Sequence, residues 1–315
     1  MSAPASAQAQ AELRAEAVRL ASEDLDHLLN TADQVRRQRW GARVSFCAIV
    51  NARCGVCSED CAFCAQSSHH DTDVSPFGLI DADAMVDAAR RAGRAGAARM
   101  GIVTSGSAIS GCELDDVCAA VARITDETGV APCASLGSLS PQAARSLRDA
   151  GLSRYHHNLE TSERFFPHVC TSHTYEDRVR TVRVALDAGL EVCAGGLFGM
   201  GETWEDRIDL ALALRELSVS SIPINFLMPV PGTPMGGRPL LSADDALRTI
   251  ALFRMLSPEA EVRVCGGRDL VLGSSGDRIY QAGATGAMIG DYLTQPGGDP
   301  AADLKAARAL GLEVA

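Results

Sequence analysis

Residues 44–70 of this chain read VSFCAIVNARCGVCSEDCAFCAQSSHH. Residues 44–50 form a short apolar run typical of a buried β-strand, and a cysteine-rich loop follows it. In that loop, Cys57, Cys61 and Cys64 have a C-x3-C-x2-C spacing. Three thiolates on one loop suit an iron–sulfur cluster or zinc, and the C-x2-C pair of Cys54 and Cys57 keeps a structural zinc site open. The stretch therefore predicts a metal centre directly after a strand.

Similar strands recur along the whole chain, with helical segments between them. The predicted strands are 44–50, 98–104, 131–137, 153–160, 191–198, 221–228, 260–266 and 286–292. The predicted helices are 81–95, 113–128, 140–150, 174–189, 202–217, 242–256, about 274–283 and 301–311. This α/β alternation predicts a parallel sheet, and eight units in 315 residues favour a closed (β/α)8 TIM-type barrel. In such a barrel the chemistry is expected at the C-terminal ends of the strands.

The N-terminal region is predicted to lie outside this repeat. Residues 1 to about 10 have the composition of a disordered tail, and 11–39 form a charged, amphipathic helical stretch with apolar positions such as Leu20, Leu25 and Leu28. We therefore expect a tail and helical cap over 1–39 and a single barrel domain over 40–315. No break in composition marks a further domain.

Composition excludes several classes of function. The formal net charge is −11 and Lys305 is the only lysine, so no basic stripe exists that could neutralise nucleic-acid phosphates. The N-terminal stretch has no apolar core and no run is apolar enough to cross a bilayer, which predicts a soluble cytoplasmic protein with no membrane partner. Because the cytosol keeps thiols reduced, the eleven cysteines argue for metal binding rather than a disulfide framework.

The cysteine loop resembles that of the radical S-adenosylmethionine (SAM) superfamily, in which the C-x3-C-x2-C loop follows the first barrel strand and holds a 4Fe–4S cluster. The resemblance implies that Cys57, Cys61 and Cys64 hold such a cluster and leave one iron open for SAM. Phe63 lies between two of these cysteines, and the resemblance implies that it covers the SAM adenine. Cys54 is interpreted as a bystander.

Further motifs, from about residue 40 to the C-terminus, resemble the biotin synthase family. They are YHHNLET at 155–161, SHTYEDR at 172–178, GLFGMGET at 196–203, PINFLMPVPGTP at 223–234 and RVCGGR at 263–268. The resemblance implies radical SAM-dependent insertion of sulfur into dethiobiotin to form biotin. It also implies an electron donor such as flavodoxin or ferredoxin, and a homodimer.

Polar residues alternate along the predicted strand 153–160. His156, Asn158 and Glu160 are expected to face the barrel interior together, where three polar groups are costly to bury unless they bind something. The resemblance implies that Asn158 and Glu160 contact the SAM ribose or the substrate, and that Asn225 holds substrate. His156 replaces an asparagine that helps to hold the dethiobiotin ureido ring, and an imidazole can still make one such hydrogen bond.

Two other motifs have implied contacts with SAM. Arg178 opens a predicted helix and could pair with the SAM carboxylate in a bidentate manner, although a surface arginine is the ordinary alternative. Gly199, Gly201 and Glu202 are predicted to form a tight strand-to-helix loop that approaches SAM with backbone groups.

The family also carries an auxiliary cluster, usually a 2Fe–2S site with three cysteines and one arginine. Cys133, Cys193 and Arg263 match three of these ligands, but the remaining cysteine position is occupied by Gly101. Cys265 lies two residues after Arg263, so the two side chains are expected on the same face of a strand. We therefore predict that Cys265 replaces the missing ligand.

The remaining cysteines are interpreted with less specificity. Cys47 on the first strand could be a fourth thiolate or a small filler. Four thiolates suit a 4Fe–4S auxiliary cluster better than a 2Fe–2S cluster, and Arg263 could be a ligand or an offsetting charge. Cys112, Cys118 and Cys170 lie away from the quoted motifs and are interpreted as fillers.

Two alternative functions stay open. One is another radical SAM barrel of the hydrogenase-maturation or methylornithine-synthase type, which is not expected to combine Cys133, Cys193 and Arg263. The other is a noncatalytic iron–sulfur or zinc scaffold, which leaves the inward row of polar residues on 153–160 unexplained.

Overall fold

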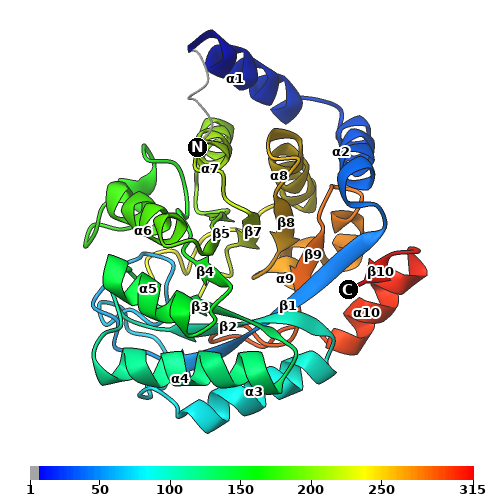
Figure 1. Cartoon of the computed structure of the whole chain (residues 1–315). Coiled ribbons are helices and arrows are strands. Elements are labelled where there is room, and N and C mark those ends of the chain that lie inside the picture. The colour runs from blue at the N-terminus through cyan, green and yellow to red at the C-terminus, as the bar shows by residue number, and fades with distance from the viewer. Residues whose placement is uncertain (1–6) are drawn as a thin grey trace.

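The computed structural model describes residues 7–315 and consists of a closed barrel of parallel strands with helices around it (Figure 1). The strands are β1 (Arg43–Arg53), β2 (Ala97–Thr104), β3 (Ala131–Ser135), β4 (Arg154–His156), β5 (Glu191–Cys193), β6 (Gly196–Phe198), β7 (Ser221–Phe226), β8 (Glu261–Val264), β9 (Gly286–Met288) and β10 (Glu313–Val314). Pairing of β9 with β1 closes the ring, β5 and β6 both pair with β7, and β10 pairs in parallel with the first two residues of β1. The predicted (β/α)8 barrel is confirmed.

Helices connect successive strands and bury one face against them. They are α3 (Ala82–Arg94), α4 (Cys112–Glu127), α5 (Pro141–Asp149), α6 (Tyr175–Asp187), α7 (Trp204–Glu216), α8 (Ala243–Leu256), α9 (Arg268–Leu272) and α10 (Pro300–Ala309). In α3, for example, Asp81 caps the first turn by accepting a hydrogen bond from Ala84 N, and Met85 and Ala89 are fully buried one turn apart. Within residues 7–315, no helix combines the length and apolar character that a membrane span requires.

The N-terminal extension forms two helices, α1 (Ala7–Ala21) and α2 (Leu25–Trp40), which pack against α7 and α8 (Figure 1). Leu28 and Leu29 of α2 are buried in the same apolar core as the barrel. Arg36 is buried too, and it donates hydrogen bonds to the carbonyls of Tyr280 and Gly41. The predicted tail is too long, because a helix begins at Ala7; residues 1–6 of that tail lie outside the described part of the chain.

Three predicted elements differ from the structure. The strand expected over 153–160 ends at His156, and Glu160 adopts a left-handed φ of 68°. The strand expected over 191–198 is split into β5 and β6, because Gly195 packs so closely on β7 that a Cβ there would lie 2.0 Å from Pro223 O. The helix expected at about 274–283 is the short α9 followed by a 3-10 segment, η2 (Gly273–Ile279).

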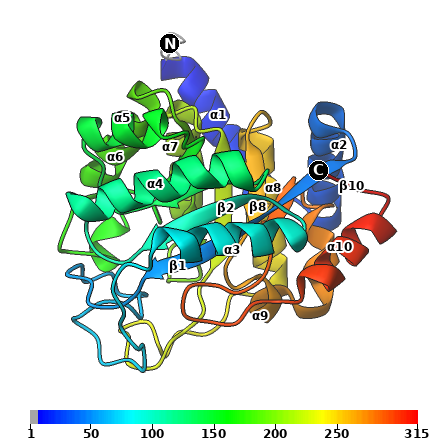
Figure 2. The same ribbon diagram turned by 60° about the horizontal axis from the view of Figure 1, so that its bottom comes forward.

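Long loops gather at one end of the barrel. Figure 2 shows the loop after β1, the loop after β7 and the loop after β9 on the same side of the molecule. Hydrogen bonds join them: Met235 N donates to Ala62 O at 3.2 Å, and Asn51 Nδ2 donates to Leu293 O at 3.0 Å. This is the end at which a barrel of this kind places its chemistry.

Candidate active site

Three cavities open at this loop-covered end, and two of them share side chains; the third, of about 510 Å³, lies between residues 53–58, 76–78 and 105–108. Of the two that share side chains, the larger, of about 390 Å³, lies inside the barrel. The smaller, of about 220 Å³, lies between the cysteine loop and the segment that leads into α6. Phe63, His156, Asn158 and Glu160 line both cavities, so one group of side chains connects the two.

Cys57, Cys61 and Cys64 are brought together at the smaller cavity, as their spacing predicts. The loop is folded by its own backbone: Cys57 N donates to Gln66 O at 3.1 Å, and Cys64 N donates to Cys61 O at 2.9 Å. At its start, Gly55 has a φ of 74° and packs on Pro76 where a Cβ would lie 2.7 Å away.

The electrostatics of this loop fit a cationic cluster core. Burial raises the pKa of Cys64 to about 11, and a hydrogen bond with Cys170 together with burial raises the pKa of Cys61. Packed thiols of this kind lose their protons when iron supplies the compensating positive charge. The three cysteines therefore fit a 4Fe–4S cluster.

Arg178 points into the smaller cavity from the first turn of α6, which Thr174 caps with Asp177. Its Nη2 lies 4.0 Å from Cys61 Sγ, and its Nη1 donates to Asn158 O at 3.0 Å. Its Nε is buried and has no hydrogen-bond partner among residues 7–315. A largely buried guanidinium with one unsatisfied nitrogen, beside the cluster loop, suits an anionic group of a ligand and is not a surface arginine.

His156, Asn158 and Glu160 line the cavities together, although β4 ends at His156 and does not reach the other two. His156 closes β4, and a hydrogen bond from Gly195 N to Asn158 Oδ1, 3.1 Å long, holds the next turn. Asn158 Nδ2 donates in turn to Glu160 Oε2 at 3.3 Å. Burial lowers the pKa of His156, which keeps the imidazole neutral and able to donate or accept a hydrogen bond.

Asn225 of β7 lines the barrel cavity. Its Oδ1 accepts from Gly266 N at 3.0 Å and its Nδ2 donates to Gly196 O at 3.2 Å, so one amide hydrogen is left for a ligand. Asn225 therefore has a fixed orientation toward the cavity.

In the glycine loop after β6, the backbone N–H groups already have partners within the chain. The Glu202 carboxylate folds back and accepts hydrogen bonds from the N–H groups of Gly199, Met200 and Gly201, and it pairs with Arg207 at 2.8 Å. These N–H groups therefore face a carboxylate of the chain itself and are not free to approach SAM. The observed task of Glu202 is to close its own loop.

Besides Cys64, four cysteines line the larger cavity. They are Cys47 of β1, Cys133 of β3, Cys193 of β5 and Cys265, one residue beyond β8. Gly101 of β2 is the register partner of Cys133 in the same wall, where it supplies no ligand atom. Cys265 thus lies in the cavity, as strand parity predicts.

Arginines surround these thiols. Arg263 donates from Nε to Glu261 at 3.1 Å and from Nη1 and Nη2 to Ser45. Arg154 forms an ion pair with the same Glu261 at 2.7 Å. Burial raises the pKa of Glu261, but the charges of the two arginines outweigh this effect and lower that pKa to about 2. The pKa of Cys47 is lowered as well, first by a hydrogen bond with Cys265 and then by the arginine charges.

Burial acts in the opposite direction on the remaining two thiols. It raises the pKa of Cys133 to about 11 and also raises the pKa of Cys193. A cationic wall around several soft ligands fits an anionic, thiolate-bound cluster.

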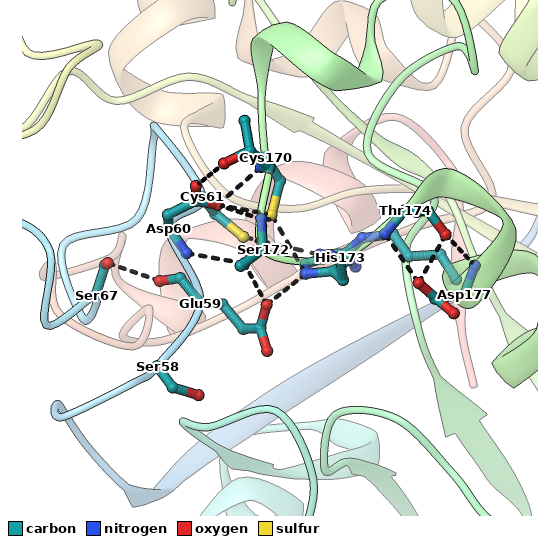
Figure 3. A network of polar contacts seen from close by, with 12 residues as sticks. Ser58, Glu59, Asp60, Cys61, Ser67, Cys170, Ser172, His173, Thr174 and Asp177 are labelled. Atoms are coloured by element: carbon teal, nitrogen blue, oxygen red, sulfur yellow. Dashed lines mark hydrogen bonds and ion pairs between the residues drawn. The ribbon is translucent and has the colours of Figure 1, made fainter.

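Sequence reasoning missed Cys170. Its thiol, the Cys61 thiol and His173 Nδ1 all lie within 4.8 Å of one another (Figure 3). Cys112 is exposed and Cys118 is half-buried in α4, away from the cavities. The sequence offered one signal for a role of Cys170, which is its position just before the motif at 172–178 that leads to Arg178.

Comparison with known proteins gives consistent matches. Residues 53–214 match the Radical SAM superfamily, and residues 223–313 match the Biotin and Thiamin Synthesis associated domain. A biotin synthase of Trichlorobacter lovleyi is 51% identical over 94% of this chain and 89% of its own length. A biotin synthase of Geobacter sulfurreducens is 49% identical over 92% of this chain and 89% of its own length.

Two solved structures share the fold. Methylornithine synthase superimposes with a TM-score of 0.83 at 18% identity, covering 96% of this chain and 94% of its own. The FeFe-hydrogenase maturase of Carboxydothermus hydrogenoformans gives a TM-score of 0.82 at 16% identity, covering 95% of this chain and 75% of its own.

Proposed function

This chain belongs to the biotin synthase family of radical SAM enzymes, and we propose that its two cavities act together to insert sulfur into dethiobiotin. One observation carries the proposal. The cavity with Cys57, Cys61 and Cys64 and the cavity with the four barrel cysteines share His156, Asn158 and Glu160. A substrate held at this row would lie between the source of the radical and the source of the sulfur.

When bound, the 4Fe–4S cluster with SAM supplies a 5′-deoxyadenosyl radical, and the auxiliary cluster supplies the sulfur atom. Arg178 would hold the SAM carboxylate through its unsatisfied nitrogen, and Glu160, 3.7 Å from Arg178, would hold the ribose. Phe63, which lines both cavities, would cover the adenine. These contacts orient SAM before the radical forms.

Uncharged side chains, whose orientation is in part already fixed by hydrogen bonds within the chain, would hold the substrate. Neutral His156 can make one hydrogen bond to a ureido group, and Asn158 and the free amide hydrogen of Asn225 can make others. Most of the exposed wall surface of the larger cavity is apolar, which would limit the number of water molecules held near a reactive radical.

The auxiliary cluster would be held by Cys133, Cys193 and Cys265, with Cys47 as the fourth thiolate. This ligand set favours a 4Fe–4S type over the alternative 2Fe–2S type. All three nitrogens of Arg263 already donate hydrogen bonds, which supports an offsetting charge rather than a ligand.

Electron supply and assembly belong to the same proposal. A low-potential protein such as flavodoxin or ferredoxin would reduce the SAM cluster, and the chain would act as a homodimer. Both follow from the family resemblance alone.

The function is tested by anaerobic turnover of the reconstituted protein with dethiobiotin, SAM and a reductant. We expect biotin, and 5′-deoxyadenosine formation that depends on dethiobiotin. Alanine at Cys57, Cys61 or Cys64 should abolish SAM cleavage and leave the auxiliary spectrum in place. Formation of 5′-deoxyadenosine that is indifferent to dethiobiotin, without biotin, would contradict the substrate assignment.

A further inference from the structure

A second group of metal-binding side chains lies behind Cys61, on the side of the cysteine loop that faces the start of α6 (Figure 3). Cys170 follows the 3-10 segment η1 (Phe166–His168), and His173 directly precedes the cap of α6. Glu59 comes from the cysteine loop itself. None of these three residues has a part in the proposed chemistry.

The donor atoms are close enough to share one ion. Cys61 Sγ, Cys170 Sγ and His173 Nδ1 lie within 4.8 Å of one another, and Cys170 Sγ is 3.2 Å from His173 Nδ1. Sulfur and nitrogen on one tetrahedral ion, with bonds of about 2.3 and 2.0 Å, lie about 3.5 Å apart. Glu59 Oε2 lies 2.6 Å from His173 Nδ1 and would supply a fourth ligand after a small movement.

The ligand atoms of this group are joined by hydrogen bonds. His173 Nδ1 contacts both Glu59 Oε2 and Cys170 Sγ, at 2.6 and 3.2 Å. The Cys170 thiol donates to Asp60 Oδ1 at 3.1 Å, and the Ser172 hydroxyl donates to Glu59. A cation that replaces the thiol protons would be bound by sulfur and nitrogen atoms that these contacts already hold together.

The site is also shielded and anchored. Cys61 and Cys170 are 8% and 4% exposed, so bound metal would be held away from bulk water. Asp60 accepts hydrogen bonds from the backbone N–H groups of Thr171 and Ser172, which ties the cysteine loop to the segment carrying Cys170. The two halves of the site are therefore in position before metal arrives.

We propose that, while the SAM cluster is absent, Cys61, Cys170 and His173 bind a single soft divalent cation, iron(II) in its working form, with Glu59 completing the site. Two thiolates and an imidazole suit iron(II) and zinc(II), and disfavour magnesium and calcium. Both thiol protons leave to solvent as the ion binds.

The shared ligand gives this site a role in loading the cluster. This role rests on the proposed assignment of Cys61 as a ligand of the SAM cluster. An iron(II) ion that already holds Cys61 can pass to the adjoining Cys57 and Cys64 without leaving the chain. Once the cluster forms, Cys61 is no longer available and the single-ion site is vacated.

The test uses Co²⁺ as a spectroscopic probe of the full chain, stripped of metal and kept reduced. The parent variant carries Cys57→Ala and Cys64→Ala, with serine at Cys47, Cys133, Cys193 and Cys265, to remove the other ligands of both clusters. We expect one equivalent of Co²⁺ with tetrahedral and thiolate charge-transfer absorption. Adding Cys170→Ser or His173→Gln should weaken Co²⁺ binding by at least about tenfold, because a direct ligand is lost.

Cys112→Ser in the same parent is the matched control, because Cys112 is an exposed cysteine of α4, and its Co²⁺ binding should not change. Circular dichroism checks that each variant is folded. If Cys170→Ser does not fold, the Co²⁺ binding of His173→Gln alone tests the site. The proposed site would be overturned if the parent, Cys170→Ser and His173→Gln had the same Co²⁺ affinity and spectra. It would also be overturned if Cys112→Ser weakened Co²⁺ binding as much as Cys170→Ser and His173→Gln do.

The loading role has its own readout. With Cys57 and Cys64 present, the rate of SAM-cluster formation at limiting Fe²⁺ and sulfide should fall on the order of tenfold in Cys170→Ser. Equal rates would overturn the role. None of these measurements uses SAM or dethiobiotin, so a negative result leaves the proposed function standing, and absence of biotin formation leaves the cation site standing.

Discussion

Individual residues determine which cluster ligands the larger cavity offers. Gly101 leaves the wall of β2 without a ligand, whereas Cys265 brings a thiol into the same cavity from the end of β8. The neighbouring Cys265 thiol lowers the pKa of Cys47, and the positive charge of Arg263 acts in the same direction. The cationic surroundings would stabilise a thiolate-bound cluster whichever strand supplies the thiol.

Cys265→Ser tests this residue-level assignment. The side chain keeps its volume and loses a thiolate, so we expect the auxiliary cluster to be lost or converted and biotin formation to stop, while SAM cleavage continues. Iron analysis and Mössbauer spectra of the reconstituted protein measure the first effect. Cys118→Ser, in α4, is the control. Unchanged auxiliary iron and undiminished biotin formation would return Cys265 to a packing role and point to Cys47.

At the scale of elements, α6 positions the SAM side of the site. Its N-terminal capping box joins the Thr174 hydroxyl to Asp177 N at 3.2 Å, and the Asp177 carboxylate to Thr174 N at 2.9 Å. Arg178 follows directly in the first turn. The cap therefore sets where the guanidinium enters the smaller cavity.

Thr174→Ala should have two separable effects. Loss of the cap should lower the free energy of unfolding by about 1 kcal/mol. Because Arg178 would lose its support, the Kd for SAM of the cluster-loaded protein should rise. Ser242→Ala removes the cap of α8, where Ser242 accepts from Asp245 N at 3.1 Å, and should lower stability alone. An equal SAM affinity in both variants would show that the cap does not position Arg178.

At the scale of the whole molecule, the N-terminal helices and the barrel share one apolar core. Leu29 of α2 is fully buried and belongs to the same contiguous cluster as Ile250 of α8 and Ile222 of β7. A cap that is packed in this way should unfold together with the barrel.

Leu29→Ala tests that cooperativity. The cavity it leaves should lower the free energy of unfolding by about 2–5 kcal/mol, as a downward shift of one thermal transition seen by circular dichroism. Leu310→Ala, at a side chain that is 49% exposed, should change it by less than about 0.5 kcal/mol. A separate early transition in Leu29→Ala would mean that the cap unfolds on its own.

The sequence by itself determined the fold class and most of the candidate site. Alternating strand and helix patterns are local, so eight repeats predicted the barrel even where individual strands end early. The spacing of Cys57, Cys61 and Cys64 is also local, because one loop carries all three ligands. Strand parity was enough to turn Cys265 inward, since side chains two residues apart share a face.

Only the tertiary structure decided how distant segments meet. Cys170 lies beside Cys61 although 109 residues separate them in the sequence, because the loop after β1 and the segment before α6 converge at one end of the barrel. Glu202 turns onto its own loop, and Asn158 and Glu160 reach both cavities from a turn rather than a strand. These arrangements depend on barrel closure and backbone turns, which contacts across the whole chain determine and a local pattern does not encode.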